Sequence, residues 1–214
     1  MSLRLVSRPA EAGAVTGLLD RAVTTPAGLL LEGEAGIGKT TVWFTALDLA
    51  ARRGFVTLSA RTAETESVLG YAGLADLLGG IDAAVWDELP SAQKAALDRV
   101  LLYDDVGGAE TDRRAVAAGF LSVLATLARQ SPVLLAIDDL QWLDASSVQA
   151  VAFAARRLQG RIGVLATERV EPAVGSMCSW LQLPQPEGLT RIQVRPLGFG
   201  GLNAIVSDRL GRSV

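Results

Sequence analysis

The feature that most constrains this chain is the octapeptide Gly33-Glu34-Ala35-Gly36-Ile37-Gly38-Lys39-Thr40. It fits the phosphate-binding pattern G-x-x-x-x-G-K-[ST] at every fixed position. An apolar run at residues 28–31 precedes it and a helical pattern follows, which is the strand–loop–helix context that the pattern requires. Glycines let successive backbone N–H groups point inward at phosphate oxygens, and the helix adds the positive end of its dipole. The octapeptide therefore predicts an α/β fold with a nucleotide phosphate at the loop.

Lysine usage argues against the alternative, a glycine-rich turn that matches the pattern by chance. The chain has 22 Gly, but only two of its 20 basic residues are lysines, Lys39 and Lys94. With that composition a chance match has a probability of roughly a few in a thousand. In this interpretation Lys39 reaches the β- and γ-phosphates, and the Thr40 hydroxyl helps to hold Mg²⁺.

Composition narrows the class of protein. A chain of 214 residues can bury one well-formed core. A single cysteine, Cys178, excludes an internal disulfide, and the absence of histidine removes histidine bases and histidine metal ligands. A net charge of −3 gives no electrostatic footprint for nucleic acid. With no apolar run near the ~18 residues of a membrane span and no signal peptide, we expect a cytoplasmic protein.

Hydrophobic periodicity predicts alternating strands and helices. The expected strands are residues 28–33, 55–60, 133–137, 162–166 and 190–194. The expected helices are residues 11–23, 40–53, 74–78, 92–102 after a Ser91 cap, 112–130 capped by Thr111, 146–158 and 202–210. Residues 170–189 have the composition of a loop. Apolar strands that alternate with helices indicate a parallel sheet covered on both faces.

A second group of candidate site residues follows the apolar strand 133–137. Asp138 and Asp139 come directly after it, where a Mg²⁺–nucleotide site needs carboxylates. We expect Asp138 to support the metal, partly through water, and Asp139 to orient an attacking water; the alternative is an ordinary acidic turn. Arg169 follows the next strand and is either a γ-phosphate sensor or a solvated side chain. Asp144 is expected to cap the following helix, and Trp142 to pack.

Two absences favour an adenine nucleotide. A GTPase needs an N-K-x-D type guanine reader, but the only asparagine is Asn203, which is followed by Ala204. The L-S-G-G-Q signature of transporter ATPases is also missing. We therefore expect ATP or ADP with Mg²⁺ as the ligand.

The chain resembles a known family at three strings. Residues 30–40 (LLEGEAGIGKT), residues 71–74 (YAGL) and residues 134–144 (LLAIDDLQWLD) are similar to the ATPase module of large LuxR-type bacterial transcriptional regulators, which belong to the STAND class of signalling ATPases. The resemblance implies a P-loop NTPase three-layer sandwich with a five-stranded parallel sheet, the ASCE/AAA-type core. It also implies that residues 1–214 form this core, ahead of helical lid, winged-helix and C-terminal helix-turn-helix domains.

In that family the module is a nucleotide switch. ADP holds a closed state, ATP favours an open state that self-associates, and the helix-turn-helix domain binds DNA. By position, the resemblance implies that Asp138 is the metal acidic residue, Asp139 the hydrolysis residue and Arg169 the arginine that reads the γ-phosphate. The residues it implies for nucleotide binding are Gly33, Glu34, Ala35, Gly36, Ile37, Gly38, Lys39, Thr40 and Thr41, with Val6 and Arg8 at the adenine. Ser7 replaces the glycine usual before that arginine.

Two other functions remain open at this point. One is a housekeeping P-loop enzyme such as a small-molecule kinase, which needs an acceptor pocket and an arginine-rich lid. The Arg113-Arg114 and Arg156-Arg157 pairs lie in predicted helices and are expected to be solvated. The other is an ATP-binding scaffold without turnover. Whichever of these three functions applies, we do not expect residues 1–214 to bind DNA by themselves.

Overall fold

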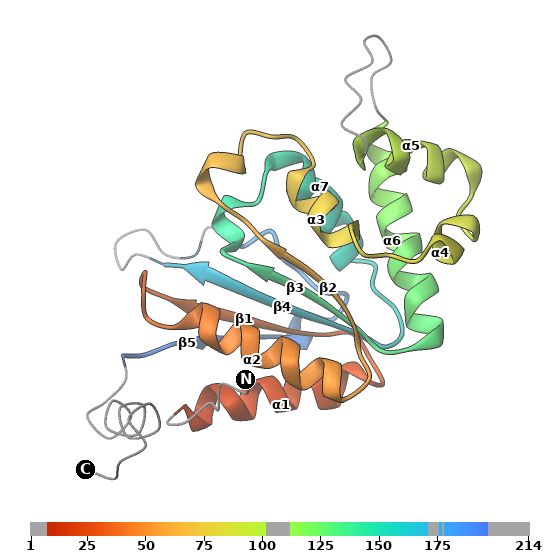
Figure 1. Ribbon diagram of the computed structural model, residues 1–214. Coiled ribbons are helices and arrows are strands. Elements are labelled where there is room, and N and C mark those ends of the chain that lie inside the picture. The colour runs from red at the N-terminus through yellow and green to blue at the C-terminus, as the bar shows by residue number, and fades with distance from the viewer. Residues whose placement is uncertain (1–7, 102–111, 171–175, 177, 197–214) are drawn as a thin grey trace, which may run out of the picture.

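The chain folds around five parallel strands in the order β2-β3-β4-β1-β5. The computed structural model describes residues 8–101, 112–170, 176 and 178–196. The strands are β1 (Ala27–Gly33), β2 (Val56–Arg61), β3 (Val133–Asp138), β4 (Ile162–Arg169) and β5 (Leu189–Gln193). β4 pairs with both β1 and β3, so the strand that leads into the glycine-rich loop and the strand that ends in Asp138 are separated by one strand (Figure 1).

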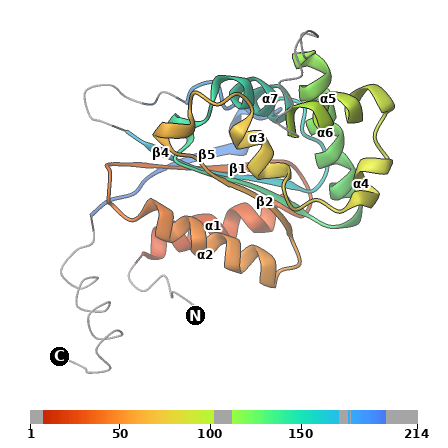
Figure 2. The same ribbon diagram turned by 45° about the horizontal axis from the view of Figure 1, so that its top comes forward.

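Helices cover both faces of this sheet, which gives three layers (Figure 2). On one face lie α1 (Pro9–Ala22) and α2 (Lys39–Arg52). On the other lie α3 (Ala72–Leu78), α6 (Arg113–Gln130) and α7 (Ala145–Ala155). The short helices α4 (Ala83–Asp87) and α5 (Ser91–Leu101) pack on α6, away from the sheet. The predicted α/β three-layer sandwich with a five-stranded parallel sheet is confirmed.

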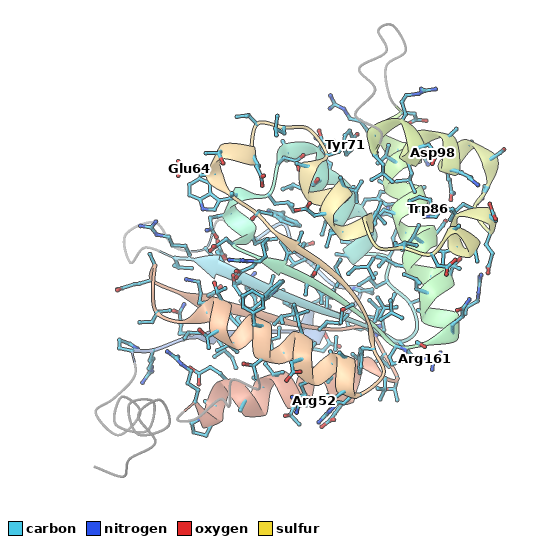
Figure 3. The ribbon with its side chains drawn as sticks, viewed as in Figure 1. Arg52, Glu64, Tyr71, Trp86, Asp98 and Arg161 are labelled. Carbon is cyan, nitrogen blue, oxygen red and sulfur yellow. The ribbon has the colours of Figure 1, made fainter. Side chains whose placement is uncertain are left out.

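The central strands form because their side chains are apolar on both faces. Every residue of β1 and β3 is buried, whereas β2 at the sheet edge alternates toward solvent. The parallel arrangement brings the carboxyl ends of all strands to one edge. Figure 3 shows Glu64, which follows β2, at that edge and Arg161, which precedes β4, at the opposite edge. The candidate site therefore lies at the edge where Glu64 lies.

Several expected boundaries differ from the structure. Asp112 caps α6 by accepting the N–H groups of Arg114 and Ala115, so the cap is not Thr111, which lies outside the described residues. Ser91 is the first helical residue of α5 rather than its cap. β4 extends to Arg169 instead of ending at residue 166, because Thr167 and Glu168 are fully buried and continue the ladder with β1.

Two further segments complete the comparison with the sequence. The short helix α4 was not predicted, since five residues carry too little periodicity. The expected helix at 202–210 lies outside the described residues. Within the expected loop 170–189, Leu181 and Leu183 are buried in the core, and the Cys178 N–H donates to the Glu168 carboxylate at 3.0 Å. This part of the loop thus covers the sheet.

Candidate functional site

The loop between β1 and α2 has the backbone that phosphate binding requires. Gly36 and Gly38 have φ values of +73° and +102°, in the left-handed region that favours glycine. Gly38 is also the N-cap of α2, and it supplies no side chain to the first N–H groups of the helix. The first N–H groups of α2 have no side-chain cap, and this arrangement, together with the helix dipole, is the kind that favours a bound anion.

Lys39 lies inside this loop. Its side chain is nearly buried, and its ammonium group donates to the carbonyl oxygens of Gly33 and Glu34 at 2.9 Å each. Burial lowers the pKa of the Lys39 ammonium, an effect that the carboxylates of Asp139 and Asp138 partly oppose. A nearby anion would favour the charged form in the same way. A phosphate next to Lys39 would therefore stabilise its charged form.

Asp138 and Asp139 lie at the end of β3, and two threonines hold the peptide between them. The Thr167 hydroxyl on β4 donates to Asp138 Oδ1 at 2.6 Å and accepts the Asp139 N–H at 2.8 Å. From beyond β2, the Thr62 hydroxyl lies 3.0 and 2.6 Å from the carbonyl oxygens of Asp138 and Asp139. Asp139 has φ +58°, a left-handed conformation that costs about 1–2 kcal/mol in a non-glycine residue. The threonines offset that cost by holding the backbone, and Thr167 also fixes the Asp138 carboxylate.

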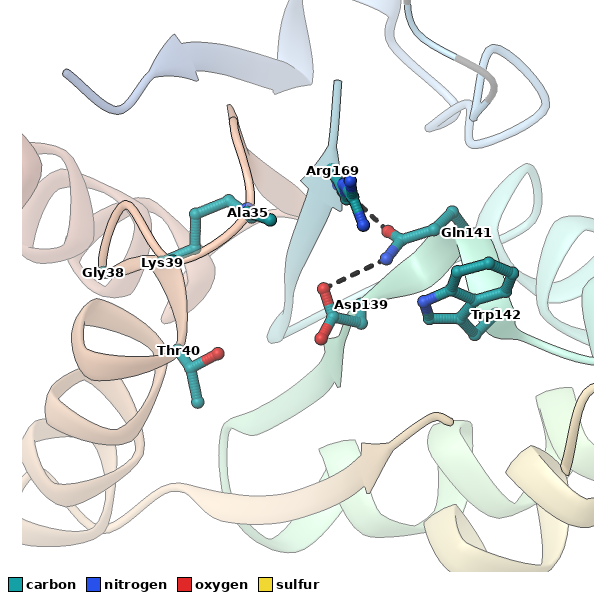
Figure 4. A pocket seen from close by; sticks show the side chains of 9 residues that line it. Ala35, Gly38, Lys39, Thr40, Asp139, Gln141, Trp142 and Arg169 are labelled. Carbon is teal, nitrogen blue, oxygen red and sulfur yellow. Dashed lines mark hydrogen bonds between the residues drawn. The ribbon is translucent and has the colours of Figure 1, made fainter. Parts of the chain in front are cut away.

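Gln141 connects Asp139 with the end of β4. Its Nε2 donates to Asp139 Oδ1 at 3.1 Å, and its Oε1 accepts the backbone N–H of Arg169 at 3.0 Å. Figure 4 shows Gln141 between these two residues, across the cavity from Lys39 and Thr40. A change at Arg169 can therefore reach Asp139 through one side chain.

The glycine-rich loop and the β3 and β4 ends enclose a cavity of about 270 Å³. Its lining residues are Ala35, Gly36, Gly38, Lys39, Thr40, Asp139, Gln141, Trp142 and Arg169. Trp142, expected to pack away from ligand, is thus part of the wall (Figure 4). Asp138 does not line the cavity; it lies behind Asp139, with its side chain 3% exposed. The remaining candidates, Gly33, Glu34 and Ile37 before α2 and Thr41 within it, do not line the cavity.

The residues around Asp138 fit a Mg²⁺ ion that is shared with a nucleotide. Thr167 occupies Oδ1, while Oδ2 lies 3.7 Å from Nε of Arg61, so a cation already faces this oxygen. Within the described ranges there is no group of three or more histidine, cysteine or acidic residues that could cage a metal. Mg²⁺ in phosphate sites takes one or two protein oxygens and fills its shell with phosphate and water. Thr40, which lines the cavity, would be a direct donor, and Asp138, which does not line it, would support the ion partly through water.

Arg8 lies against the outer side of the loop. Its guanidinium donates to the Ile37 carbonyl at 2.5 Å, to the Glu11 carboxylate at 3.0 Å and to the Arg195 carbonyl at 3.2 Å. It thereby ties the loop to α1 and to the segment after β5. Val6, the other residue expected near the adenine, lies outside the described residues.

Asp144 has the capping role expected from the sequence, and a second one. It accepts the N–H groups of Ser146 and Ser147 at the start of α7. It also accepts the N–H groups of Tyr71 at 2.8 Å and Gly73 at 3.1 Å, at the start of α3. One buried carboxylate therefore joins two helices next to the site.

Four polar residues of the site were not assigned from the sequence: Arg61, Thr62, Gln141 and Thr167. Gln141 belongs to the string at residues 134–144 and Thr167 lies two residues before Arg169, but nothing in either segment indicates which atoms these side chains would bind. Arg61 and Thr62 carry no sequence signal, because their roles follow from the pairing of β2 with β3. The expected exposure of Arg113, Arg114, Arg156 and Arg157 is confirmed.

Comparisons with known proteins agree with this architecture. Residues 4–166 match the family model described as AAA ATPase domain. No match was found among curated proteins. Among the described helices, none is long and apolar enough to cross a membrane.

Several solved structures have the same fold. AMPPCP-bound DnaA from Aquifex aeolicus matches with a TM-score of 0.53 and 14% identity, over 96% of this chain and 51% of that one. The Aeropyrum pernix Orc1 protein in complex with DNA gives 0.56 and 16%, over 97% and 50%. Drosophila ORC bound to DNA gives 0.55 and 15%, over 97% and 47%. The chain spans about half the length of these proteins, and identities this low show the fold alone.

The family match covers most of the chain, and the β2-β3-β4-β1-β5 sheet with its glycine-rich loop after β1 is the matching architecture. The chain belongs to the AAA ATPase domain family.

Proposed function

We propose that this chain binds ATP and ADP with Mg²⁺ and acts as a slow ATPase that switches a LuxR-type transcriptional regulator. The observation that carries the proposal is the single cavity into which Lys39 and Thr40 project from one side and Asp139 and Arg169 from the other. Phosphate ligands, a carboxylate for a water molecule and a cation for the γ-phosphate are the parts that ATP hydrolysis requires.

Each residue has a task in this proposal. Lys39 exchanges its two carbonyl partners for phosphate oxygens, and the first N–H groups of α2 bind the same phosphates. Thr40 and Asp138 hold Mg²⁺, which when bound neutralises phosphate charge. Asp139, fixed by Thr62 and Gln141, orients the attacking water.

The switch is proposed to operate through Gln141. Arg169 lines the cavity and reads the γ-phosphate, and its backbone N–H is bound by Gln141, which also donates to Asp139. Loss of the γ-phosphate then alters the environment of Asp139 and of the β3 end together. In this proposal, the part of the regulator that changes conformation in response lies in the other domains of the LuxR-type protein.

The regulatory context is supported by the resemblance of residues 30–40, 71–74 and 134–144 to the LuxR-type ATPase module. In this proposal the ATP-bound regulator self-associates in the cytoplasm, and DNA binding belongs to its helix-turn-helix domain. The described DnaA and ORC relatives share the fold, and DNA and AMPPCP appear as ligands of those proteins.

The test is a single-turnover ATP hydrolysis measurement on wild type and Asp139→Asn. We expect slow hydrolysis by the wild type, loss of most of it in the variant, and nearly unchanged ATP affinity, because only water positioning is lost. Hydrolysis at the parental rate in Asp139→Asn would contradict the role of Asp139. Turnover that depends on an added phosphate acceptor would indicate a kinase, and bound ATP without turnover would indicate a scaffold.

A further inference from the structure

Arg61 is a cation beside Asp138 that the hydrolysis scheme does not use. It is the last residue of β2, and it lies directly opposite Asp138 in the parallel pairing of β2 with β3. Paired residues of neighbouring strands project to the same face, so the position is set by the sheet register. Nε of Arg61 lies 3.7 Å from Oδ2 of Asp138.

The two oxygens of Asp138 have partners of different kinds. Oδ1 accepts a 2.6 Å hydrogen bond from the Thr167 hydroxyl. Thr167 is fully buried, and its hydroxyl also accepts the Asp139 N–H. Oδ2 faces Arg61, whose side chain is 60% exposed. The Thr167 contact is therefore a fixed part of the core, whereas the Arg61 contact can break by moving a side chain that already reaches solvent.

Arg61 has a second favourable contact besides Asp138. Its guanidinium carbon lies 5.2 Å from the centroid of the Phe44 ring on α2, within the range of a cation–π contact. Phe44 is itself 44% exposed, so the ring remains accessible if the guanidinium shifts along it. Leaving Asp138 would not leave the charge without a favourable neighbour.

We propose that Arg61 is a place-holding cation that neutralises Asp138 Oδ2 in the metal-free protein and is displaced when Mg²⁺ binds with nucleotide. A buried carboxylate without a counter-charge is costly, and Arg61, together with the nearby Lys39 ammonium, lowers that cost before metal arrives. Two cations at one carboxylate oxygen repel each other, so filling of the metal site and departure of Arg61 are coupled. Arg61 thus sets the Mg²⁺ concentration at which the site fills. The inference rests on the proposed nucleotide site.

The sign of the effect separates this role from the usual one. An arginine that contacts phosphate strengthens nucleotide binding, so its removal weakens binding in Mg²⁺. A place-holder competes with Mg²⁺, so its removal lowers the Mg²⁺ concentration that is needed. Because Arg61 is largely exposed, the effect is screened, and we expect a shift of about two- to fivefold.

The experiment measures ADP affinity by calorimetry in excess EDTA and over a series of Mg²⁺ concentrations. It compares wild type with Arg61→Gln, Arg61→Lys and the control Arg53→Gln. Arg53 is an exposed arginine near the far end of α2 that pairs with Asp20 at 2.7 Å, so its loss removes the same charge away from the site. Circular dichroism and melting curves establish that each variant is folded.

We expect Arg61→Gln to need about two- to fivefold less Mg²⁺ for half of the gain in ADP affinity, with Arg61→Lys and Arg53→Gln close to wild type. An unchanged or higher requirement in Arg61→Gln would overturn the inference, as would an Arg61→Lys variant that behaves like Arg61→Gln. Wild-type ADP affinity that does not change with Mg²⁺ would overturn the inference about Arg61, but not the proposal that the chain binds nucleotide. Failure of the wild type to bind ADP at all would refute the proposed function itself.

Discussion

At the scale of single residues, the site depends on hydroxyl groups as much as on charges. Thr167 uses its one hydroxyl twice, as donor to Asp138 and as acceptor from Asp139. Thr62, the residue after β2, binds the same dipeptide. The Asp138 carboxylate therefore keeps a fixed direction, and the Asp139 backbone is held in its left-handed conformation. In our account this rigidity means that Mg²⁺, which gives up its water shell reluctantly, meets ligands that are already in place.

Thr167→Val tests this point, because valine keeps the shape of the side chain and removes both hydrogen bonds. We expect a loss of about 1–3 kcal/mol in the free energy of unfolding, since the buried Asp138 carboxylate and the partly buried Asp139 N–H lose their partner. The gain in ADP affinity on adding Mg²⁺ should also fall, while affinity in EDTA stays near wild type. Urea titration and calorimetry measure the two effects.

Two further variants make the Thr167 result specific. Thr167→Ser keeps the hydroxyl and should restore the response to Mg²⁺. Thr126→Val removes the hydroxyl of another buried threonine, on α6, and should leave nucleotide binding unchanged. A Thr167→Val protein with the wild-type Mg²⁺ response would show that Thr167 does not position Asp138.

At the scale of elements, α3 and α7 are joined through one carboxylate. Asp144 accepts four backbone N–H groups, two from the start of each helix. Gly73 on α3 also approaches closely: a Cβ added there would lie 2.3 Å from Leu143 Cδ1. The wall of the site that contains Gln141 and Trp142 is therefore attached to the helical layer on that face of the sheet.

We predict that Asp144→Ala costs about 2–4 kcal/mol in the free energy of unfolding, because a cap is lost and further buried N–H groups lose their acceptor. Asp112→Ala is the matched control. Asp112 also caps a helix, but it is exposed and accepts N–H groups of α6 alone, so we expect about 1 kcal/mol. Urea unfolding of both variants measures the difference, and equal costs would contradict the joining role of Asp144.

Sequence periodicity predicted the elements that matter for the site, and the reasons are physical. β1 and β3 are apolar except for Glu32 and Asp138 near their carboxyl ends, because both of their faces are covered, and this makes them visible as continuous runs. The end of β4 was missed because Thr167 and Glu168 are polar yet fully buried, and their partners come from distant parts of the chain. Strand order, and with it the Arg61–Asp138 contact, depends on pairing that no local pattern records.

At the scale of the whole molecule, the proposed phosphate site lies on a protein of negative net charge. Acidic residues number 23 against 20 basic ones, so the positive field that the loop needs is local. It comes from Lys39, the start of α2 and Arg169, which all border one cavity. A ligand with concentrated negative charge fits this arrangement better than an extended polyanion does.

We accordingly predict that residues 1–214 do not bind DNA in a sequence-specific manner. Specific binding needs a recognition element and several phosphate contacts, and its strength grows with the number of protein cations that contact the DNA backbone. The measurement is a fluorescence anisotropy titration with promoter DNA at about 0.15 M salt, with and without ATP. Saturable, sequence-specific binding would overturn the division of labour in the proposed regulator.

The central claim is that the loop from Gly33 to Thr40 binds an adenine nucleotide, and calorimetric titration with ADP and Mg²⁺ tests it most directly. We predict saturable one-to-one binding by the wild type. Lys39→Ala should weaken it roughly 10–150-fold, because a charge-assisted contact worth about 1.5–3 kcal/mol is lost. The control is Lys94→Ala, which removes the only other lysine. Lys94 forms an exposed ion pair with Asp87 on α4, so this variant should bind like wild type. No binding by the wild type, or unchanged affinity in folded Lys39→Ala, would contradict the claim.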